Sequence, residues 1–250
     1  MKVLVTRPDK SGAELVAILQ QHQINAIQYS PIEFTRGREL TQLPSVLASL
    51  NSGDYVLCVS KNAITFAHQI LVKTQTQWRD DLHYFAIGRA SAEYLASVCQ
   101  QAVKFPTKFA NSEAFLELVE MQNIKGKNFL ILRADRGREL ISSTAMQRGA
   151  NVLPFECYKK VVKNDINEKM FFFKQERIDT IIISSCDILM MLFEKTALEN
   201  KEWLMQCQLI VVSRRIAKLA IDLGYNKDNI IVSTQVNNSS LLTAIVSKLG

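Results

Sequence analysis

The sequence contains few of the residues that mark metal, redox or disulfide chemistry. Of its 250 residues, nine are glycine, five are proline, five are cysteine and three are histidine. The cysteines are widely spaced and form no Cys-x-x-Cys pair, and neither they nor the histidines have the spacing of metal ligands. We therefore expect buried, reduced thiols and no metal site.

Several catalytic motifs are also absent. The sequence has no G-x-x-x-x-G-K-[ST] phosphate loop, no G-x-G-x-x-G dinucleotide fingerprint and no G-x-S-x-G nucleophile elbow. An enzyme built from this chain would therefore use no cofactor. It would act by binding and orienting a reactive substrate.

Long apolar runs are missing too. Asp187, Glu194 and Lys195 interrupt the most apolar segment, so no run approaches the ~18 residues of a membrane span. The N-terminus enters a predicted strand within three residues and lacks a signal-peptide pattern. We therefore expect a cytoplasmic protein that makes no membrane contact.

The charge balance is basic, with a formal net charge of +6 and a pI of about 9.0. This excess favours anionic partners. The basic residues stand mostly singly at the ends of predicted strands, and zinc-finger spacing, a ribonucleoprotein signature and long Lys/Arg blocks are absent. The pattern indicates a small polyanion rather than a nucleic acid.

The chain repeats itself at half its length. Val3–Glu33 and Phe129–Tyr158 share one plan, in which an apolar strand ends in arginine and is followed by a helix with Glu-Leu and a second strand. An offset of 125 residues separates Leu15 from Leu140. The same offset relates Asp54–Asn62 to Asp179–Asp187, so we interpret the chain as a duplication of strand–helix units.

Short Val/Ile/Leu strands alternate with amphipathic helices. This alternation predicts an α/β fold of parallel sheets with helices on both faces, and Ser112 is predicted to cap a helix reaching Met121. Each half could fold by itself, or the opening unit Lys2–Pro31 could join the sheet made by the last strands. Two irregular, extended segments, Phe34–Leu40 and Lys159–Asn167, favour the second arrangement because a tandem needs one linker.

Ligands of open parallel sheets bind beyond the carboxyl ends of the strands, where the following helices start. In this sequence those positions hold serines, small residues and arginines, which suit carboxylates or phosphates. Taken singly, each serine is better explained as a helix cap. Three arginines, Arg133, Arg136 and Arg138, interleave with Asp135 and Glu139, which predicts a solvated ion-pair surface as readily as a ligand grip. Two lobes presenting such loops to each other would form a cleft for a ligand with many negative groups.

An ordered set of motifs resembles the uroporphyrinogen-III synthase family across essentially the whole chain. The motifs are VTRP, SPIEF, VSKNAI, AIGRASA, LRADRGREL, GANV, CYKK and, more weakly, IISS and VVSRRIA. The resemblance implies cofactor-independent cyclisation of hydroxymethylbilane, with inversion of ring D and loss of water, in heme biosynthesis. The alternative is a non-catalytic two-lobed binding protein for a small polyanion.

The resemblance also implies two flavodoxin-like lobes joined by a two-stranded connector, in a monomer that contacts the preceding pathway enzyme transiently. Lobe 1 would comprise residues 1–35 and 164–250, lobe 2 residues 41–157, and the connector residues 36–40 and 158–163. Tyr158 would assist departure of the substrate hydroxyl. The expected substrate-binding residues are Arg7, Ser60, Lys61, Asn62, Arg89, Ser91, Arg133, Arg138, Ser184, Ser185, Ser213, Arg214 and Ser239. Ser213-Arg214-Arg215 departs from the Gly-x-Thr-type turn of many members. Either carboxylate binding there would depend more on arginine, or the loop would be displaced.

Overall fold

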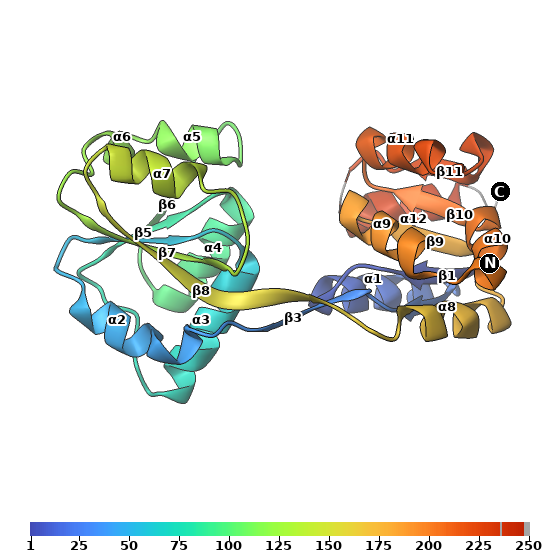
Figure 1. Ribbon diagram of the computed structural model, residues 1–250, viewed down its shortest axis with the longest axis horizontal. Helices are drawn as coiled ribbons and strands as arrows, with labels where there is room; N and C mark the ends of the chain where they lie inside the picture. Colours follow the sequence, from blue (N-terminus) through green and yellow to red (C-terminus); the bar gives the residue numbers. More distant parts are fainter. Residues whose placement is uncertain (236, 248–250) are drawn as a thin grey trace. The chain divides into compact units, whose positions relative to one another are not determined.

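A computed structural model describes residues 1–235 and 237–247 (Figure 1). The chain divides into two compact units. Unit 1 contains Met1–Glu33 and the segment from Val161 onwards, and unit 2 is Phe34–Lys160. The finer division into lobes and connector segments stays a prediction. No helix in the described ranges combines the length and apolar character needed to cross a membrane.

Unit 1 is built on a five-stranded sheet with the order β11-β10-β9-β1-β2, in which neighbouring strands run parallel. This order joins the opening strand–helix–strand segment to the last three strands. The strands are β1 (Lys2–Val5), β2 (Asn25–Gln28), β9 (Thr180–Ile183), β10 (Gln208–Val211) and β11 (Ile230–Val232).

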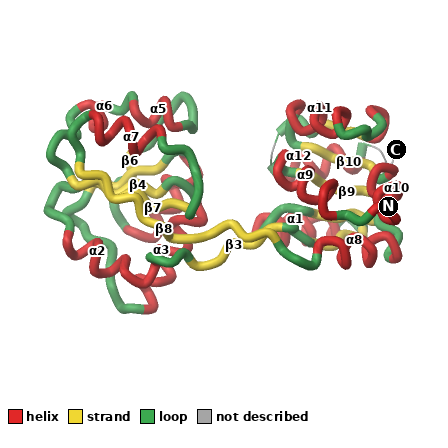
Figure 2. The backbone as a smooth tube through the Cα atoms, viewed as in Figure 1, coloured by secondary structure: helices red, strands yellow, loops and turns green. Residues whose placement is uncertain are grey.

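Helices cover both faces of this sheet because its strands are apolar on both sides (Figure 2). Along β1, Leu4 packs on one face, while Val3 and Val5 pack on the other. The first face carries α8 (Ile166–Gln175), α9 (Cys186–Lys195), α10 (Leu198–Gln206) and α11 (Arg214–Asp222), and the second carries α1 (Asp9–Gln21) and α12 (Asn238–Val246).

Unit 2 is built on a six-stranded sheet with the order β3-β8-β7-β4-β5-β6. The five strands from β8 to β6 are parallel. The strands are β3 (Ile32–Arg36), β4 (Tyr55–Cys58), β5 (His83–Ala86), β6 (Val103–Lys104), β7 (Asn128–Ala134) and β8 (Asn151–Val162).

Two apolar clusters lie on opposite faces of the unit 2 sheet. Val56 and Leu130 face the cluster under α2 (Leu43–Ser49), α3 (Lys61–Lys73) and α4 (Arg89–Cys99). Leu57 and Phe129 face the cluster under α5 (Ser112–Leu116), α6 (Val119–Gln122) and α7 (Leu140–Gln147). Short 3-10 turns, Leu40–Gln42 in unit 2 and Lys227–Asn229 in unit 1, complete the helical elements of the described residues.

The predicted α/β fold with two parallel sheets is confirmed. The two segments predicted to be extended are so only in part: residues 34–36 belong to β3 and residues 159–162 to β8, whereas a 3-10 turn begins at Leu40 and α8 begins at Ile166. The N–H of Gly37 donates to the carbonyl of Cys157 at 2.9 Å, and that of Lys163 donates to the carbonyl of Pro31 at 2.9 Å. Residue numbers fall along one strand as they rise along the other, so β3 and β8 are antiparallel. A Cβ on Gly37 would clash with the carbonyl oxygen of Glu156, so the two backbones approach closely there.

The prediction that Ser112 caps a helix reaching Met121 is wrong. The side chain of Asn111 caps this helix instead by accepting from the N–H of Ala114 at 2.8 Å. The helix ends at Leu116, and a second short helix begins at Val119 after an extended Leu118.

Candidate functional site

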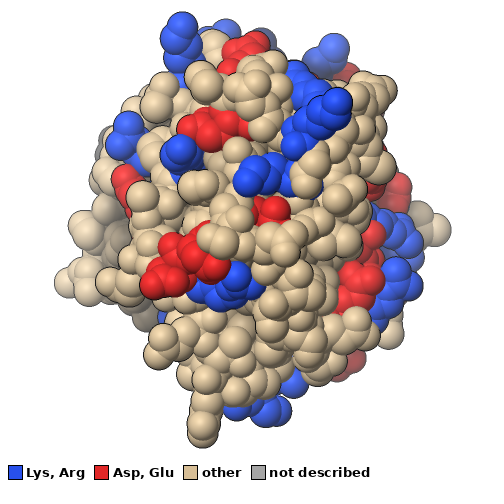
Figure 3. Space-filling view, turned by 90° about the vertical axis from the view of Figure 1, so that its left-hand side faces the viewer, with Lys and Arg blue, Asp and Glu red and all other residues tan. Residues whose placement is uncertain are grey.

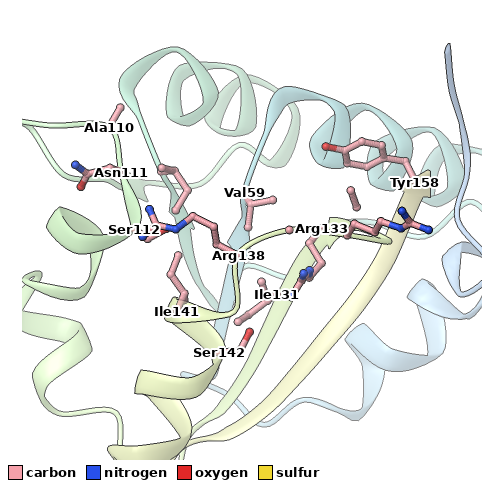
Figure 4. A pocket seen from close by; sticks show the side chains of 14 residues that line it. Val59, Ala110, Asn111, Ser112, Ile131, Arg133, Arg138, Ile141, Ser142 and Tyr158 are labelled. Carbon is pink, nitrogen blue, oxygen red and sulfur yellow. The ribbon is translucent and has the colours of Figure 1, made fainter. Parts of the chain in front are cut away.

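A pocket of about 370 Å³ lies in unit 2 where β7 and β4 end and the helices α5 and α7 begin (Figure 4). Its apolar wall includes Val59, Ile87, Ile131 and Ile141. Its polar side chains are Asn111, Ser112, Arg133, Arg136, Arg138, Ser142 and Tyr158. The pocket therefore pairs an apolar wall with three guanidinium groups and a phenol at the carboxyl edge of a parallel sheet.

A β-bulge places Tyr158 at this pocket. In the β7–β8 register, Arg133 lies opposite Glu156 and Ala134 lies opposite Tyr158, so Cys157 is the extra residue. Side chains normally alternate between the faces of a strand, but a bulge turns the chain locally. Cys157 and Tyr158 are consequently both buried, with exposed fractions of 0% and 8%.

The ring of Tyr158 is held by two phenylalanines. Phe66 of α3 stacks on it with 5.8 Å between centroids and 7° between planes. Phe34 of β3 meets it edge-on, with 5.6 Å between centroids and 82° between planes. These contacts fix the plane of the phenol.

The hydroxyl of Tyr158 lies 3.0 Å from the hydroxyl of Ser60, and either oxygen could donate. Burial raises the pKa of Tyr158, the hydrogen bond with Ser60 lowers this pKa, and Cys157 and Asp135 raise it further. The net pKa lies above the ordinary value for tyrosine, so the phenol keeps its proton at neutral pH and can donate it.

The three predicted residues at the start of α3 lie in its first turn. Ser60 caps the helix by accepting from the N–H of Ala63 at 3.2 Å. Lys61 is exposed and Asn62 is half-buried, and neither lines the pocket. The helix N-terminus itself offers backbone N–H groups to an anion.

Two of the three pocket arginines are paired with carboxylates. Arg133 is 11% exposed and bonds Glu139 at 2.8 Å, and this hydrogen bond lowers the pKa of Glu139. Arg138 is 64% exposed and bonds both oxygens of Glu113, at 2.6 and 3.3 Å, which lowers the pKa of Glu113. Both partners of the Arg138–Glu113 pair are exposed, so this pair contributes little net stability, whereas in the other pair Arg133 is mostly buried and Glu139 is exposed.

The predicted residues on α4 lie outside this pocket. Arg89 is exposed, approaches Glu93 at 4.0 Å and lies over the ring of Phe105 at 5.5 Å. Ser91 is half-buried in the first turn, where its N–H donates to the carbonyl of Gly88 at 3.1 Å.

Unit 1 presents its own predicted residues at the carboxyl edge of its sheet. Ser185 and Ser213 cap α9 and α11 by accepting from the N–H groups of Ile188 and Ile216 at 3.2 and 3.4 Å. Ser184 directly follows β9 and is half-buried. Arg214 and Ser239 are exposed and lie in the first turns of α11 and α12.

Arg7 follows β1 and donates to the side-chain oxygen of Asn238 at 2.6 Å. Burial lowers the pKa of this arginine. This contact links the loop after the first strand of unit 1 to the start of its last described helix.

Of the predicted residues, the structure brings Tyr158, Arg133 and Arg138 to one pocket and sets Ser60 against Tyr158. Sequence reasoning did not select Asn111, Ser112, Arg136 or Ser142. The small polar pair at 111–112 opens a helix at the carboxyl edge of the sheet, which is a signal that could have found it. Ser142 lies inside α7, where the sequence gives no such signal.

The comparisons with known proteins agree with one another. The family model described as uroporphyrinogen-III synthase HemD matches residues 13–243. Proteins named uroporphyrinogen-III synthase from Salmonella typhimurium and Escherichia coli are each 38% identical over 247 residues, covering 98% of this chain and 100% of theirs.

Solved structures share the fold. A mutant uroporphyrinogen III synthase from Thermus thermophilus aligns over 100% of this chain and 98% of its own, with a TM-score of 0.62 and 15% identity. A uroporphyrinogen-III synthetase from Helicobacter pylori aligns over 99% of both chains, with a TM-score of 0.60 and 12% identity.

Proposed function

The chain belongs to the uroporphyrinogen-III synthase family, and on that premise we propose that the pocket of unit 2 takes part in its chemistry. The enzyme is a cofactor-independent lyase of heme biosynthesis. It cyclises hydroxymethylbilane to uroporphyrinogen III with inversion of ring D and loss of one water. The relatives reported above are all named as synthases, so they give no support to a non-catalytic binding protein.

In this proposal, Tyr158 assists the first step. The substrate carries a hydroxymethyl group on a terminal pyrrole, and its C–O bond breaks as the phenol gives a proton to the leaving oxygen. The pyrrole N–H proton released on forming the azafulvene restores the phenol, so the net loss is one water. The single observation that carries this role is the buried, protonated Tyr158 at the edge of an arginine-lined pocket.

The carboxylates of the substrate give the binding energy. We propose that Arg133 and Arg138 exchange their glutamates for substrate carboxylates, because a bidentate grip suits guanidinium. The apolar wall would contact the pyrrole ring that carries these carboxylate side chains. Anchoring the carboxylates positions the reacting carbons, so binding energy contributes to the rate of ring closure.

The remaining predicted residues stay proposals for carboxylate binding at helix starts. In unit 2 they are Ser60, Lys61, Asn62, Arg89 and Ser91, and in unit 1 they are Arg7, Ser184, Ser185, Ser213, Arg214 and Ser239. A cytoplasmic location, a monomeric state and a transient contact with the preceding pathway enzyme also stay predictions.

The face of unit 2 that Figure 3 shows does not favour nucleic acid. Most of it is uncharged, Lys and Arg are scattered among Asp and Glu, and the one short run of basic residues, at the upper right, does not extend across the face. A stripe that tracks phosphates is what nucleic-acid binding would need.

The test of the proposed function is an isomer assay. The full chain is incubated with hydroxymethylbilane and the uroporphyrinogens are oxidised and separated. We expect the type III isomer in excess, whereas the substrate alone closes to type I. A product that stays type I at high protein concentration would refute the proposal.

A further inference from the structure

Ser60 makes a contact that its role as a helix cap does not require. Ser185 and Ser213 cap their helices with nearly the same backbone, at φ −153° and −162° against −157° for Ser60. Each accepts the N–H of the residue three positions ahead. In the described part of the chain, Ser60 is the one of these three whose hydroxyl also meets a tyrosine, at 3.0 Å.

Capping uses one lone pair of the serine oxygen and leaves its proton free. The N-terminus of α3 carries the positive end of the helix dipole, which draws the lone pairs of Ser60 toward the helix and directs its proton outward. The phenol oxygen of Tyr158 is the partner in that outward direction. This arrangement favours Ser60 as the donor of the pair and Tyr158 as the acceptor.

A tyrosine that accepts here must direct its own proton elsewhere. Phe66 and Phe34 already fix the ring, so the torsion of the C–O bond is the remaining freedom of the phenol. When Ser60 donates, the phenol proton points away from α3. Because Tyr158 lines the pocket, that proton can then point into the pocket (Figure 4). Two hydrogen bonds meet at the Ser60 hydroxyl, one from the Ala63 N–H and one to Tyr158, and each strengthens the other by polarising the hydroxyl.

We infer that Ser60 is a positioning residue of the reaction: its hydroxyl donates to Tyr158 and so aims the phenol proton at the leaving hydroxyl of the substrate. The inference rests on the proposed role of Tyr158. It assigns Ser60 an action through the tyrosine, in place of direct binding of a substrate carboxylate. As the phenol gives up its proton, the same donor stabilises the charge that develops on its oxygen.

The test is a double-mutant cycle on the full-length enzyme with Ser60→Gly and Tyr158→Phe. Glycine is suitable because it is itself a favoured helix cap, so α3 keeps its start without the hydroxyl. We expect Ser60→Gly to lower kcat for type III formation about two- to tenfold, with KM unchanged. In the Tyr158→Phe background, the same change should alter kcat less than twofold. Ser60→Thr keeps the hydroxyl, so its kcat for type III formation should stay close to that of the wild type.

Two further readouts separate positioning from mere support of the helix. Tyrosine carrying ¹³C at Cζ reports ionisation of Tyr158, assigned by its loss in Tyr158→Phe. Because the hydrogen bond with Ser60 lowers the pKa of Tyr158, the titration of Tyr158 should move to higher pH in Ser60→Gly. Cys157 and Asp135, which raise this pKa, are the same in both proteins. Ser60→Asp keeps a good helix cap, but an aspartate side chain can only accept a hydrogen bond. The phenol proton should therefore point toward residue 60 and away from the pocket, which should lower kcat below that of Ser60→Gly.

Full additivity of the two substitutions, or a raised KM at unchanged kcat, would overturn the inference. An active Ser60→Asp with wild-type kcat would overturn it as well, and this variant decides the matter if Ser60→Gly does not fold. Absence of type III product from the wild-type enzyme is a different result, because it refutes the proposed function itself.

Discussion

Replacing Tyr158 by phenylalanine removes one hydroxyl and leaves the surroundings of the ring in place. The contacts with Phe34 and Phe66 are retained, and Ser60 keeps its bond to the N–H of Ala63. The substitution therefore removes one hydrogen bond, the one between the hydroxyls of Ser60 and Tyr158. The loss of free energy of unfolding should be that of one net hydrogen bond, about 0.5–1.5 kcal/mol.

The expected effect on the reaction is much larger. Proton transfer by a positioned side chain contributes roughly 10²–10⁴-fold, equivalent to about 3–5 kcal/mol of barrier. We expect kcat for type III formation to fall in that range, while the melting temperature falls by only a few degrees. Because burial raises the pKa of Tyr158, the wild-type rate should also persist on the alkaline side beyond pH 10, where an ordinary phenol ionises.

The assay compares type III formation and thermal unfolding in Tyr158→Phe and in Tyr94→Phe. Tyr94 is a matched control because its hydroxyl pairs with that of Thr65 at 3.2 Å on the same unit, outside the pocket. Tyr94→Phe should change stability similarly and leave the rate unchanged. Equal turnover of Tyr158→Phe and wild type, at comparable stability, would remove Tyr158 from the mechanism.

Three other substitutions test the site and the fold. Gly37→Ala places a Cβ against the carbonyl oxygen of Glu156, so we expect about 1–3 kcal/mol of destabilisation by denaturant titration, and an unchanged midpoint would contradict the close approach of the two backbones. Lys61→Gln should raise KM several-fold at low salt while slightly raising the melting temperature, because a cation at a helix start opposes the dipole. Lys73→Gln, in the last turn of α3, should do neither, and equal KM values would remove Lys61 from substrate binding. Burial raises the pKa of Cys207 from 9.0 to about 12. The contribution of this thiol to the free energy of unfolding is therefore complete below pH 9 and is lost as the pH rises toward 12. In Cys207→Ala the free energy of unfolding should fall less steeply between pH 9 and 12, and a fall as steep as in the wild type would refute the assignment.

Most of the fold could be predicted from local pattern. Strands such as Thr180–Ile183 are apolar on both sides, which predicts a parallel sheet covered on both faces. The serines at positions 60, 185 and 213 mark helix starts, and all three do cap helices. Such features depend on neighbours in sequence, so the sequence carries them directly.

What the pattern misses depends on distant partners. Phe34–Leu40 has no strand period, yet its first three residues belong to β3 because β3 pairs with β8. The contact of Ser60 with Tyr158 joins residues 98 positions apart. The bulge after Arg133 that buries Tyr158 is likewise a property of two paired strands, and no single stretch of sequence reveals it.

The sheet order of unit 1 has a consequence for synthesis on the ribosome. β1 pairs with β9, whose first residue, Thr180, emerges long after Val5. At about 5–20 residues per second, the opening segment waits on the order of ten to thirty seconds for that neighbour. All the strands of unit 2 are translated during this interval, so the nascent chain must keep its apolar first strand from mispairing until its last third is made.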